Sequence, residues 1–182
     1  MDIVIQPATL EMADSFRQAL DVVAREHRYL IFQEAPPLES TRKFIAQVLA
    51  KGWSQFYALH EGKVVGWCDV VRDERPGRTH VGRLGIGILP EYRGQKIGAR
   101  LLAATIADAF EKGLTRIELE VFAANERALA LYKKFGFVEE GRQRHAHCLD
   151  GAYEDSICMV LLKAVAPPTT RSDHIQAGKK VT

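Results

Sequence analysis

A short basic, glycine-containing loop that leads into a long amphipathic segment has the composition of a phosphate-binding site. The first turn of a helix leaves its N–H groups without partners inside the helix, and the helix dipole makes this end positive. Glycine lets a ligand approach the backbone, and basic side chains attract an anion. A simple turn without a ligand is the alternative. The loop and first turn comprise Arg93, Gly94, Gln95, Lys96, Ile97, Gly98 and Ala99.

The chain before this loop, about residues 79–89, has the pattern of a strand that other atoms approach closely. It contains Gly82, Gly85 and Gly87 among aliphatic residues and stops at Pro90. Glycine weakens a strand interior and usually marks a bulge or a place where a ligand or another backbone lies against it. The loop has neither a Walker motif nor the glycine spacing of a dinucleotide-binding fold. We therefore expect a phosphate-binding helix of another kind.

Two further polar residues stand where a reaction could use them. Glu120 lies near the end of an alternating segment, residues 115–122, whose apolar residues share one face and whose charged residues share the other. Tyr132 lies on the apolar stripe of a helix expected over residues 126–135, which Asn125 can cap. A solvated carboxylate and a packed tyrosine are the alternatives that need no activity.

Hydrophobic periodicity and turn residues predict the elements that position these groups. A helix separates the strands at 79–89 and 115–122, so these strands should be parallel. The segment 28–38 joins two helices and should keep its large apolar residues covered. The pattern predicts an α/β sandwich with a mixed central sheet of about seven strands and about four helices. We expect helices at about 10–27, with Thr9 as cap, 39–51, 97–112 and 126–135, and strands at 3–5, 54–60, 63–71, 79–89, 115–122, 137–148 and 152–163, with tight turns at Glu61–Gly62 and Asp150–Gly151.

Length and composition limit the class of protein. The 182 residues fit one domain, 1–163, followed by a polar stretch, 164–182, that we expect to be a mobile tail. The formal net charge of +2 gives no basic surface for nucleic acid. Three cysteines without Cys-x-x-Cys spacing argue against a disulfide framework or a zinc site. The sequence shows no leader and no long apolar run, so we expect a cytoplasmic protein without a membrane partner.

Residues 93–98, RGQKIG, resemble the acyl-CoA pyrophosphate loop of the GNAT superfamily of N-acetyltransferases, Gln/Arg-x-x-Gly-x-Gly/Ala. Lys96 replaces the usual glycine, and since a residue that opens a right-handed helix needs no positive φ, we expect it to keep its amide in place and add a cation. Asn125 with Tyr132 seven residues later, and the Tyr-x-x-x-Gly-Phe run, extend the resemblance over about residues 1–163. The chain looks most like bacterial amino-acid acetyltransferases and is also similar to ribosomal-protein-alanine acetyltransferases. The resemblance implies the GNAT acyl-CoA N-acyltransferase fold.

The resemblance also implies acetyl-CoA as co-substrate, no metal, and a role for each polar residue. Tyr132 would protonate the departing thiolate, and Glu120 would be the general base. A base that acts through water, or an amine that arrives neutral, would leave Glu120 dispensable. Asn125 would contact the cofactor, and an N–H near Ile88 would face the thioester carbonyl. The pantetheine arm would pair with the strand at Ile86, Gly87 and Ile88.

The acceptor is the least defined part of the prediction. The segment 28–38 and the final hairpin would wall the acceptor side in this fold. We expect direct transfer in a ternary complex to a free amino acid or similar small amine. A protein N-terminus, a non-catalytic acyl-CoA-binding module and a nucleotide-binding regulator are the alternatives, and a homodimer is an open alternative to a monomer. Candidate substrate contacts are Tyr29, Phe32, Glu34, His145 and His147.

Overall fold

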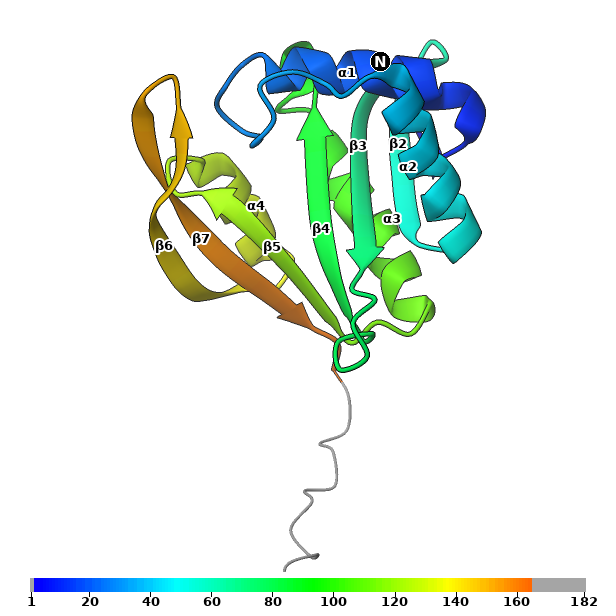
Figure 1. The fold of residues 1–182 in the computed structure, drawn as a ribbon. Helices are drawn as coiled ribbons and strands as arrows, with labels where there is room; N and C mark the ends of the chain where they lie inside the picture. The colour runs from blue at the N-terminus through cyan, green and yellow to red at the C-terminus, as the bar shows by residue number, and fades with distance from the viewer. Residues whose placement is uncertain (1, 165–182) are drawn as a thin grey trace, which may run out of the picture.

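Helices and strands follow one another in the order that the sequence predicts (Figure 1). The computed structural model describes residues 2–164, so the predicted tail lies outside the described residues from position 165 onward. The strands are β1 (Val4–Pro7), β2 (Ser54–His60), β3 (Lys63–Arg72), β4 (Val81–Ile88), β5 (Arg116–Phe122), β6 (Val138–Leu149) and β7 (Ala152–Leu162). The helices are α1 (Ala13–Ala24), α2 (Leu38–Lys51), α3 (Ile97–Glu111) and α4 (Glu126–Lys134), with 3-10 turns η1 (Leu10–Met12) and η2 (Pro90–Tyr92).

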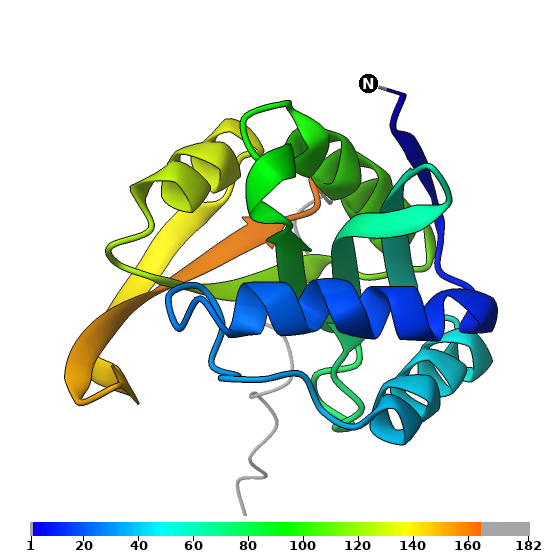
Figure 2. The same cartoon turned by 90° about the horizontal axis from the view of Figure 1, so that it is seen from above.

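The strands form one mixed sheet between two layers of helices. The strand order within the described residues is β1-β2-β3-β4-β5-β7-β6, and β4 and β5 are parallel, whereas the other neighbours are antiparallel. Helices α1 and α2 cover one face of the sheet, here the front face, and α3 and α4 cover the back face (Figure 2). The seven-stranded mixed sandwich and its parallel crossover through α3 confirm the predicted fold class.

Strands β4 and β5 are joined over only a short length. Their register pairs are Val81 with Arg116, Gly82 with Ile117, and Arg83 with Glu118. Beyond this point the two strands diverge (Figure 1), while β4 stays paired with β3 as far as Ile88. The backbone edge of β4 that faces β5 therefore has no strand partner after residue 83 within the described residues.

Each face of the sheet has its own core. On the back face, Ile97, Leu101 and Leu102 of α3 are at most 2% exposed. On the front face, Phe16 of α1 packs on Tyr57, with ring centroids 5.2 Å apart, and meets the edge of a tryptophan of β3. Burial of such a side chain stabilises the fold by about 1.5–3 kcal/mol. The two cores together fix the sheet between its helices.

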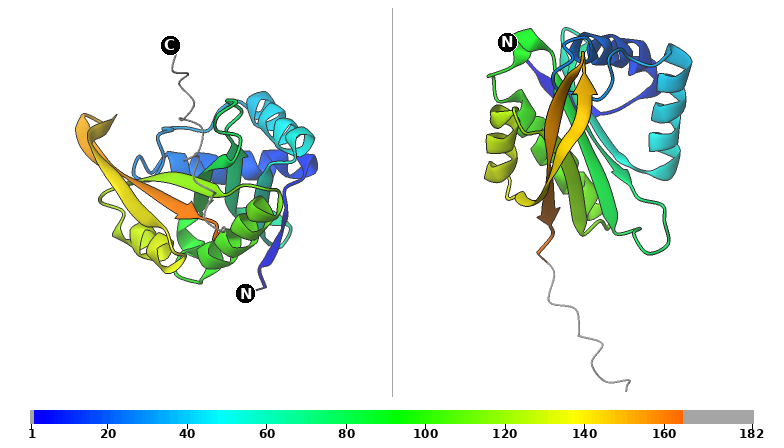
Figure 3. Two further views of the ribbon diagram at one scale, coloured as in Figure 1. Left: turned by 90° about the horizontal axis from the view of Figure 1, so that it is seen from below. Right: turned by 60° about the vertical axis from the view of Figure 1, so that its left-hand side comes forward.

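Two hairpins end in the predicted tight turns. Glu61 and Gly62 have φ values of 49° and 74°, and Asp150 and Gly151 have 50° and 79°. Positive φ at both central residues is the type I′ geometry, which matches the twist of the flanking strands. The β6–β7 hairpin extends past β5 toward the end of α1 (Figure 3).

The segment between α1 and α2 differs from its prediction. Ile31 and Phe32 are 61% and 49% exposed, although covered apolar residues are expected there. Arg17 of α1 donates from Nε to the Pro36 carbonyl (2.8 Å). Such bonds hold the segment along the outer side of α1 (Figure 2), so the sheet does not cover its apolar side chains.

The start of α1 also differs from its prediction. Thr9 precedes the 3-10 turn η1, and its side chain makes no capping hydrogen bond. The α-helix begins at Ala13, after Met12. The prediction of Thr9 as the cap of this α-helix is wrong because η1 intervenes between the two.

Candidate active site

The loop between η2 and α3 presents consecutive backbone N–H groups to the surface. No hydrogen-bond partner is found within the described residues for the N–H groups of residues 94–99. The first bond into the helix is donated by the Arg100 N–H to the Lys96 carbonyl (3.2 Å). Gly94, Gln95 and Lys96 are exposed. Partnerless amides at the positive end of a helix attract anions such as a pyrophosphate.

Lys96 has a left-handed backbone, with φ 62° and ψ 9°. The expectation that it needs no positive φ is therefore wrong. Lys96 is the residue before the first helical one, where the chain still reverses direction, and Gly94 has a φ of 83° in the same loop. A residue with a side chain costs roughly 1–2 kcal/mol in this conformation, and glycine avoids that cost.

Arg93 is held by groups outside the loop. Its guanidinium forms an ion pair with Glu26 near the end of α1 and donates from Nε to the Ile88 carbonyl (2.9 Å). The Arg93 guanidinium carbon also lies 4.7 Å from the centre of the Tyr29 ring. Arg93 thus ties α1 and the segment that follows it to the end of β4.

Arg127 is a cation beside the loop that sequence reasoning missed. A Cβ at Gly94 would lie 3.4 Å from Arg127 Nη2. Neither Arg127 nor Lys96 forms an ion pair within residues 2–164, so both charges are available to an anion. The signal was a basic residue in the first turn after the cap Asn125. Its nearness to the loop depends on how α4 packs beside α3, which the sequence does not display.

Two of the three β4 glycines make room for neighbouring side chains. A Cβ at Gly82 would lie 2.5 Å from a side chain of β3, and one at Gly87 would lie 2.2 Å from Trp67. The three atoms nearest to a Cβ at Gly85 would all belong to Asp69, with Oδ1 at 3.4 Å. Glycine is therefore required at 82 and 87 for packing, whereas a Cβ at 85 would make only ordinary contacts with its nearest neighbours.

Asn125 and Tyr132 lie on α4 as predicted. Asn125 Oδ1 accepts a hydrogen bond from the Ala128 N–H (3.2 Å), which confirms the cap. Tyr132 is 6% exposed on the back face, and its ring centre lies 5.7 Å from that of Phe137. Burial, and secondarily the nearby Cys68, raises the pKa of Tyr132 well above its usual range. Its hydroxyl therefore carries a proton at neutral pH.

Glu120 lies on the front face, the opposite face from Tyr132. Arg83 Nη2 of β4 stands 2.8 Å from Glu120 Oε1, and 30% of the glutamate side chain is exposed. Its neighbour Glu118 receives a hydrogen bond from Arg78 (2.8 Å) and is bound within its own strand as well. Glu118 is thus held in a structural network, whereas Glu120 stands just beyond the last β4–β5 pair.

A small cavity of about 140 Å³ lies between the end of α1 and the β6–β7 hairpin. His27 Nδ1 and Asp150 Oδ2 are 2.8 Å apart, and this ion pair joins the two walls. Tyr29, one of the predicted substrate contacts, lies in the cavity wall. The lining residues are His27, Arg28, Tyr29, Phe122, Ala124 and Glu154.

The other predicted substrate contacts do not line this cavity. Phe32 is exposed, and Glu34, with 73% of its side chain exposed, lies 3.4 Å from Arg25. The rings of His145 and His147 pack on aromatic neighbours, with centroids 4.8 and 4.7 Å apart. Of the five predicted substrate contacts, only Tyr29 belongs to the cavity wall.

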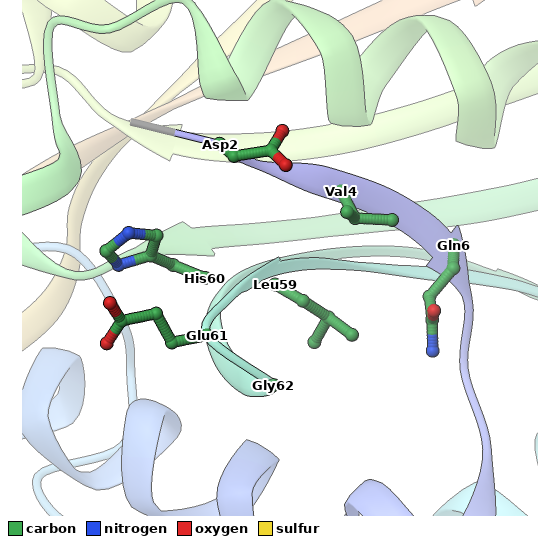
Figure 4. A pocket seen from close by; sticks show the side chains of 7 residues that line it. All are labelled: Asp2, Val4, Gln6, Leu59, His60, Glu61 and Gly62. Carbon is green, nitrogen blue, oxygen red and sulfur yellow. The ribbon is translucent and has the colours of Figure 1, made fainter.

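A second hollow, of about 550 Å³, lies at the β1 edge of the sheet (Figure 4). Figure 4 shows its side chains coming from β1 and the residue Asp2 before it, from the end of β2, and from the turn between β2 and β3. None of the predicted site residues lines it. Its lining residues are Asp2, Val4, Gln6, Leu59, His60, Glu61 and Gly62.

Three other features of residues 2–164 bear on the site. Cys68, Cys148 and Cys158 are free. No cluster of three or more His, Cys, Asp or Glu residues is arranged to hold a metal ion in this range. No helix in the same range has the length and apolar character needed to cross a bilayer.

Comparison with known proteins agrees with this geometry. The profile of the acetyltransferase (GNAT) family matches residues 19–137. The L-amino acid N-acetyltransferase AaaT of Escherichia coli K12 is 32% identical over 62% of this chain and 70% of its own length. The ribosomal protein bS18-alanine N-acetyltransferase of the same strain is 30% identical over 73% of this chain and 87% of its own. The structure of yncA from Salmonella typhimurium with its cofactor acetyl-CoA has a TM-score of 0.85, 14% identity, and covers 93% of this chain and 99% of that chain.

An α/β sandwich in which the start of α3 leaves its amides without partners in the described residues, beside a half-paired strand, fits the acyl-CoA-dependent N-acetyltransferase class that the comparisons indicate. The profile covers more than half of the chain. The chain belongs to the acetyltransferase (GNAT) family of acetyl-CoA-dependent N-acetyltransferases.

Proposed function

We propose that this protein transfers the acetyl group of acetyl-CoA directly to the primary amine of a free amino acid or similarly small amine, in a ternary complex. One observation carries the proposal: six consecutive amides, residues 94–99, have no partner among residues 2–164 and lie beside β4, whose backbone edge toward β5 is likewise unpaired there beyond Arg83. The amides fit a diphosphate, and the strand edge fits an extended arm with amide groups of its own.

The donor would be held by residues of the back face and the loop. The amides of the loop and the cations Lys96 and Arg127 would hold the pyrophosphate, and the backbone at Ile86, Gly87 and Ile88 would pair with the pantetheine arm. Acetyl-CoA supplies an activated acetyl group with a thiolate as leaving group. Tyr132 holds its proton on the hydroxyl and would give it to that thiolate.

The acceptor would approach from the front face. An ammonium group must lose a proton before its nitrogen can attack the thioester. Glu120 stands on this face just beyond the last β4–β5 pair, and its carboxylate is a candidate to take the proton. The position of Glu120 supports the role that the sequence predicts for it.

The dimensions of the acceptor side favour a small amine. The cavity near Tyr29 holds about 140 Å³, which suits a single side chain, and the contact of its lining residue His27 with Asp150 ties the end of α1 to the β6–β7 hairpin. A peptide would have to displace this bridge. A free amino acid could enter without doing so.

A protein N-terminus is the second candidate acceptor. Ile31, Phe32 and Tyr153 are 61%, 49% and 65% exposed around the acceptor side, and an exposed apolar surface suits a polypeptide partner. The similarity to an enzyme that acetylates a ribosomal protein also favours this alternative.

An acceptor screen separates these alternatives. Acetyl-CoA binding is measured by calorimetry, and CoA release by thiol detection with the twenty L-amino acids and with a peptide that begins with alanine. We expect binding, and release with at least one amino acid. Release with the peptide alone would make the protein acceptor correct. Binding without any release would indicate a non-catalytic acyl-CoA-binding module.

A further inference from the structure

Two polar side chains of the front face, Gln55 and Tyr57, are buried beneath α1 and α2 without hydrogen-bond partners within the described residues, and a part-buried carboxylate lies beside them. Gln55 is 3% exposed, and neither its Nε2 nor its Oε1 has a hydrogen-bond partner within the described residues. Tyr57 is fully buried, and its hydroxyl is also unpaired there. No hydrogen bond or ion pair reaches the part-buried carboxylate of Asp69 in residues 2–164. An unpaired buried polar group costs about 1–3 kcal/mol, so such a cluster calls for a polar occupant.

The sheet register brings the three side chains together. Gln55 of β2 pairs with Asp69 of β3, so both point to the same face. Tyr57 pairs with Trp67 and is the next residue of β2 on that face. The charge of Asp69 contributes, after burial, to raising the pKa of Tyr57, which shows that the two groups are close. Together they form a cluster of polar side chains with one carboxylate, the polar cluster.

The polar cluster lies beside the place where β4 and β5 separate. Asp69 pairs with Gly85 of β4, and a Cβ at Gly85 would lie 3.4 Å from Asp69 Oδ1. Gly85 comes two residues after Arg83, the last residue of β4 that pairs with β5. Because glycine has no side chain, the carboxylate stays open toward this separation, where Glu120 stands on the other strand.

Asp69 is the charged group of the polar cluster, because the surrounding charged side chains are paired with one another or exposed. On β4 and β5, Arg83 is paired with Glu120 and Arg78 with Glu118. The charged residues of α1 have partners of their own or lie exposed, and those of α2 are exposed: Asp14, Arg17, Asp21, Glu39, Arg42, Lys43 and Lys51. Burial raises the pKa of Asp69 to about 7. A proton acceptor works best when its pKa lies near the operating pH.

We propose that Asp69 is the base that receives a proton from the ammonium group of the acceptor, with Gln55 and Tyr57 holding the amine beside it. The inference rests on the proposed function, since it requires acetyl transfer to an amine. A cluster whose only charge is negative attracts a cation rather than a carboxylate. Asp69 is a catalytic residue in this proposal, and the ion pair of Glu120 with Arg83 shapes the edge of the site.

The protons and bonds balance in this scheme. One ammonium proton passes to the Asp69 carboxylate, and the neutral nitrogen attacks the thioester carbonyl. The C–N bond forms, the C–S bond breaks, and the thiolate takes a proton from Tyr132. Tyr132 regains its proton from the acylated nitrogen, and Asp69 releases its proton to solvent after the product leaves. The net products are the amide, CoA with a free thiol, and one proton.

The test compares pH profiles of the wild type and four variants with the best acceptor from the screen. For Asp69→Asn we expect turnover at pH 7 to fall about 100-fold. The deficit should shrink to less than about tenfold at pH 9.5, because more of the amine is then neutral in solution. Tyr57→Phe and Gln55→Met should raise the acceptor KM several-fold. Asp108→Asn, a carboxylate change on α3, is the matched control and should behave as the wild type.

Thermal unfolding shows whether Asp69→Asn acts through the fold. The folded pKa of Asp69 is raised above its unfolded value of about 3.9. Its ionisation therefore removes stability progressively as the pH rises from about 4 through about 7. Asp69→Asn should melt higher than the wild type at pH 8, with the gain shrinking at pH 4. A variant that is more stable yet slower identifies a functional carboxylate.

The outcomes separate this inference from the proposed function. An unchanged profile for Asp69→Asn, with the wild type active, overturns the role of Asp69 and leaves the acetyltransferase standing. A loss that is uniform across pH and is accompanied by a lower melting temperature makes Asp69 structural and also overturns the role. If no amine tested triggers release of CoA by the wild type, both the proposed function and the inference are overturned.

Discussion

The donor side and the acceptor side of this molecule are built in different ways. The donor side consists of β4, the loop at 94–99 and α3, which are consecutive in the chain and rest on a closely packed core. The acceptor side is assembled from segments around residues 27–29, 122–124 and 150–154, joined by one part-exposed ion pair. Local geometry thus fixes the donor side, whereas the acceptor side depends on long-range contacts. Relatives that share this fold can therefore be named for different acceptors.

The largest effect is expected from the donor-side acid. Tyr132→Phe removes the hydroxyl proposed to protonate the thiolate, so kcat should fall by about 100-fold. The affinity for acetyl-CoA should stay the same within about threefold, since the ring and its packing remain. Steady-state kinetics and calorimetry measure the two quantities. A kcat close to that of the wild type would show that Tyr132 only packs on α4.

A steric change tests how rigid the donor side is. Gly87→Ala places a Cβ 2.2 Å from Trp67, so the free energy of unfolding should fall by about 2 kcal/mol. Gly85→Ala is the matched control, because the atoms nearest to its Cβ, all of Asp69, lie at an ordinary contact distance. Denaturant unfolding measures the free energy of unfolding of both variants. Equal stability of the two variants would mean that β4 can shift freely.

The order of elements was readable from the chain, and so was the helix start, because each depends on neighbours within a few residues. Periodicity locates α3, and the glycines locate the hairpin turns and the loop. The exposure of Phe32 was not readable, since it depends on how distant segments meet. The left-handed backbone of Lys96 was missed because Lys96 was assigned to the helix, whereas it precedes the first helical residue. Arg127 and Asp69 were missed for the same reason: their partners Gly94 and Gly85 are brought to them by packing and register.

On the acceptor side, breaking the ion pair should affect the acceptor alone. Asp150→Asn should raise the acceptor KM several-fold and leave acetyl-CoA binding unchanged. Glu74→Gln, which removes the surface pair with Lys51, is the control. If Asp150→Asn weakens acetyl-CoA binding as strongly as acceptor binding, the two sides are not independent.

The same pair gives the acceptor side a pH dependence. The hydrogen bond to Asp150 raises the pKa of His27 above its ordinary value of about 6.5. The charged pair is therefore complete below that value and is lost as the pH rises through the raised pKa. NMR titration should show a raised pKa for His27 in the wild type and a lower one in Asp150→Asn. Identical values in both proteins would contradict the bridge.

The smallest effect is expected at the loop. Lys96→Gly relieves the strain of the left-handed backbone but raises the conformational entropy of the unfolded chain. The net gain in the free energy of unfolding should be about 0.5 kcal/mol. Loss of one cation beside the phosphates should weaken acetyl-CoA binding about threefold. Lys96→Ala keeps the strain and removes the charge, so it should lose affinity without gaining stability. Equal stability of the glycine and alanine variants would show that the left-handed backbone of Lys96 is not strained.

The two halves of the sheet meet only at the short junction of β4 with β5. Three register pairs and exposed ion pairs such as Arg83–Glu120 hold this junction together. Concentrated salt should therefore loosen the junction more than it loosens either half of the sheet. Amide protons along the far half of β4 should then exchange rapidly with deuterated water in the free protein. They should exchange slowly once a second backbone fills that edge, so the enzyme would complete its own sheet only while it is loaded.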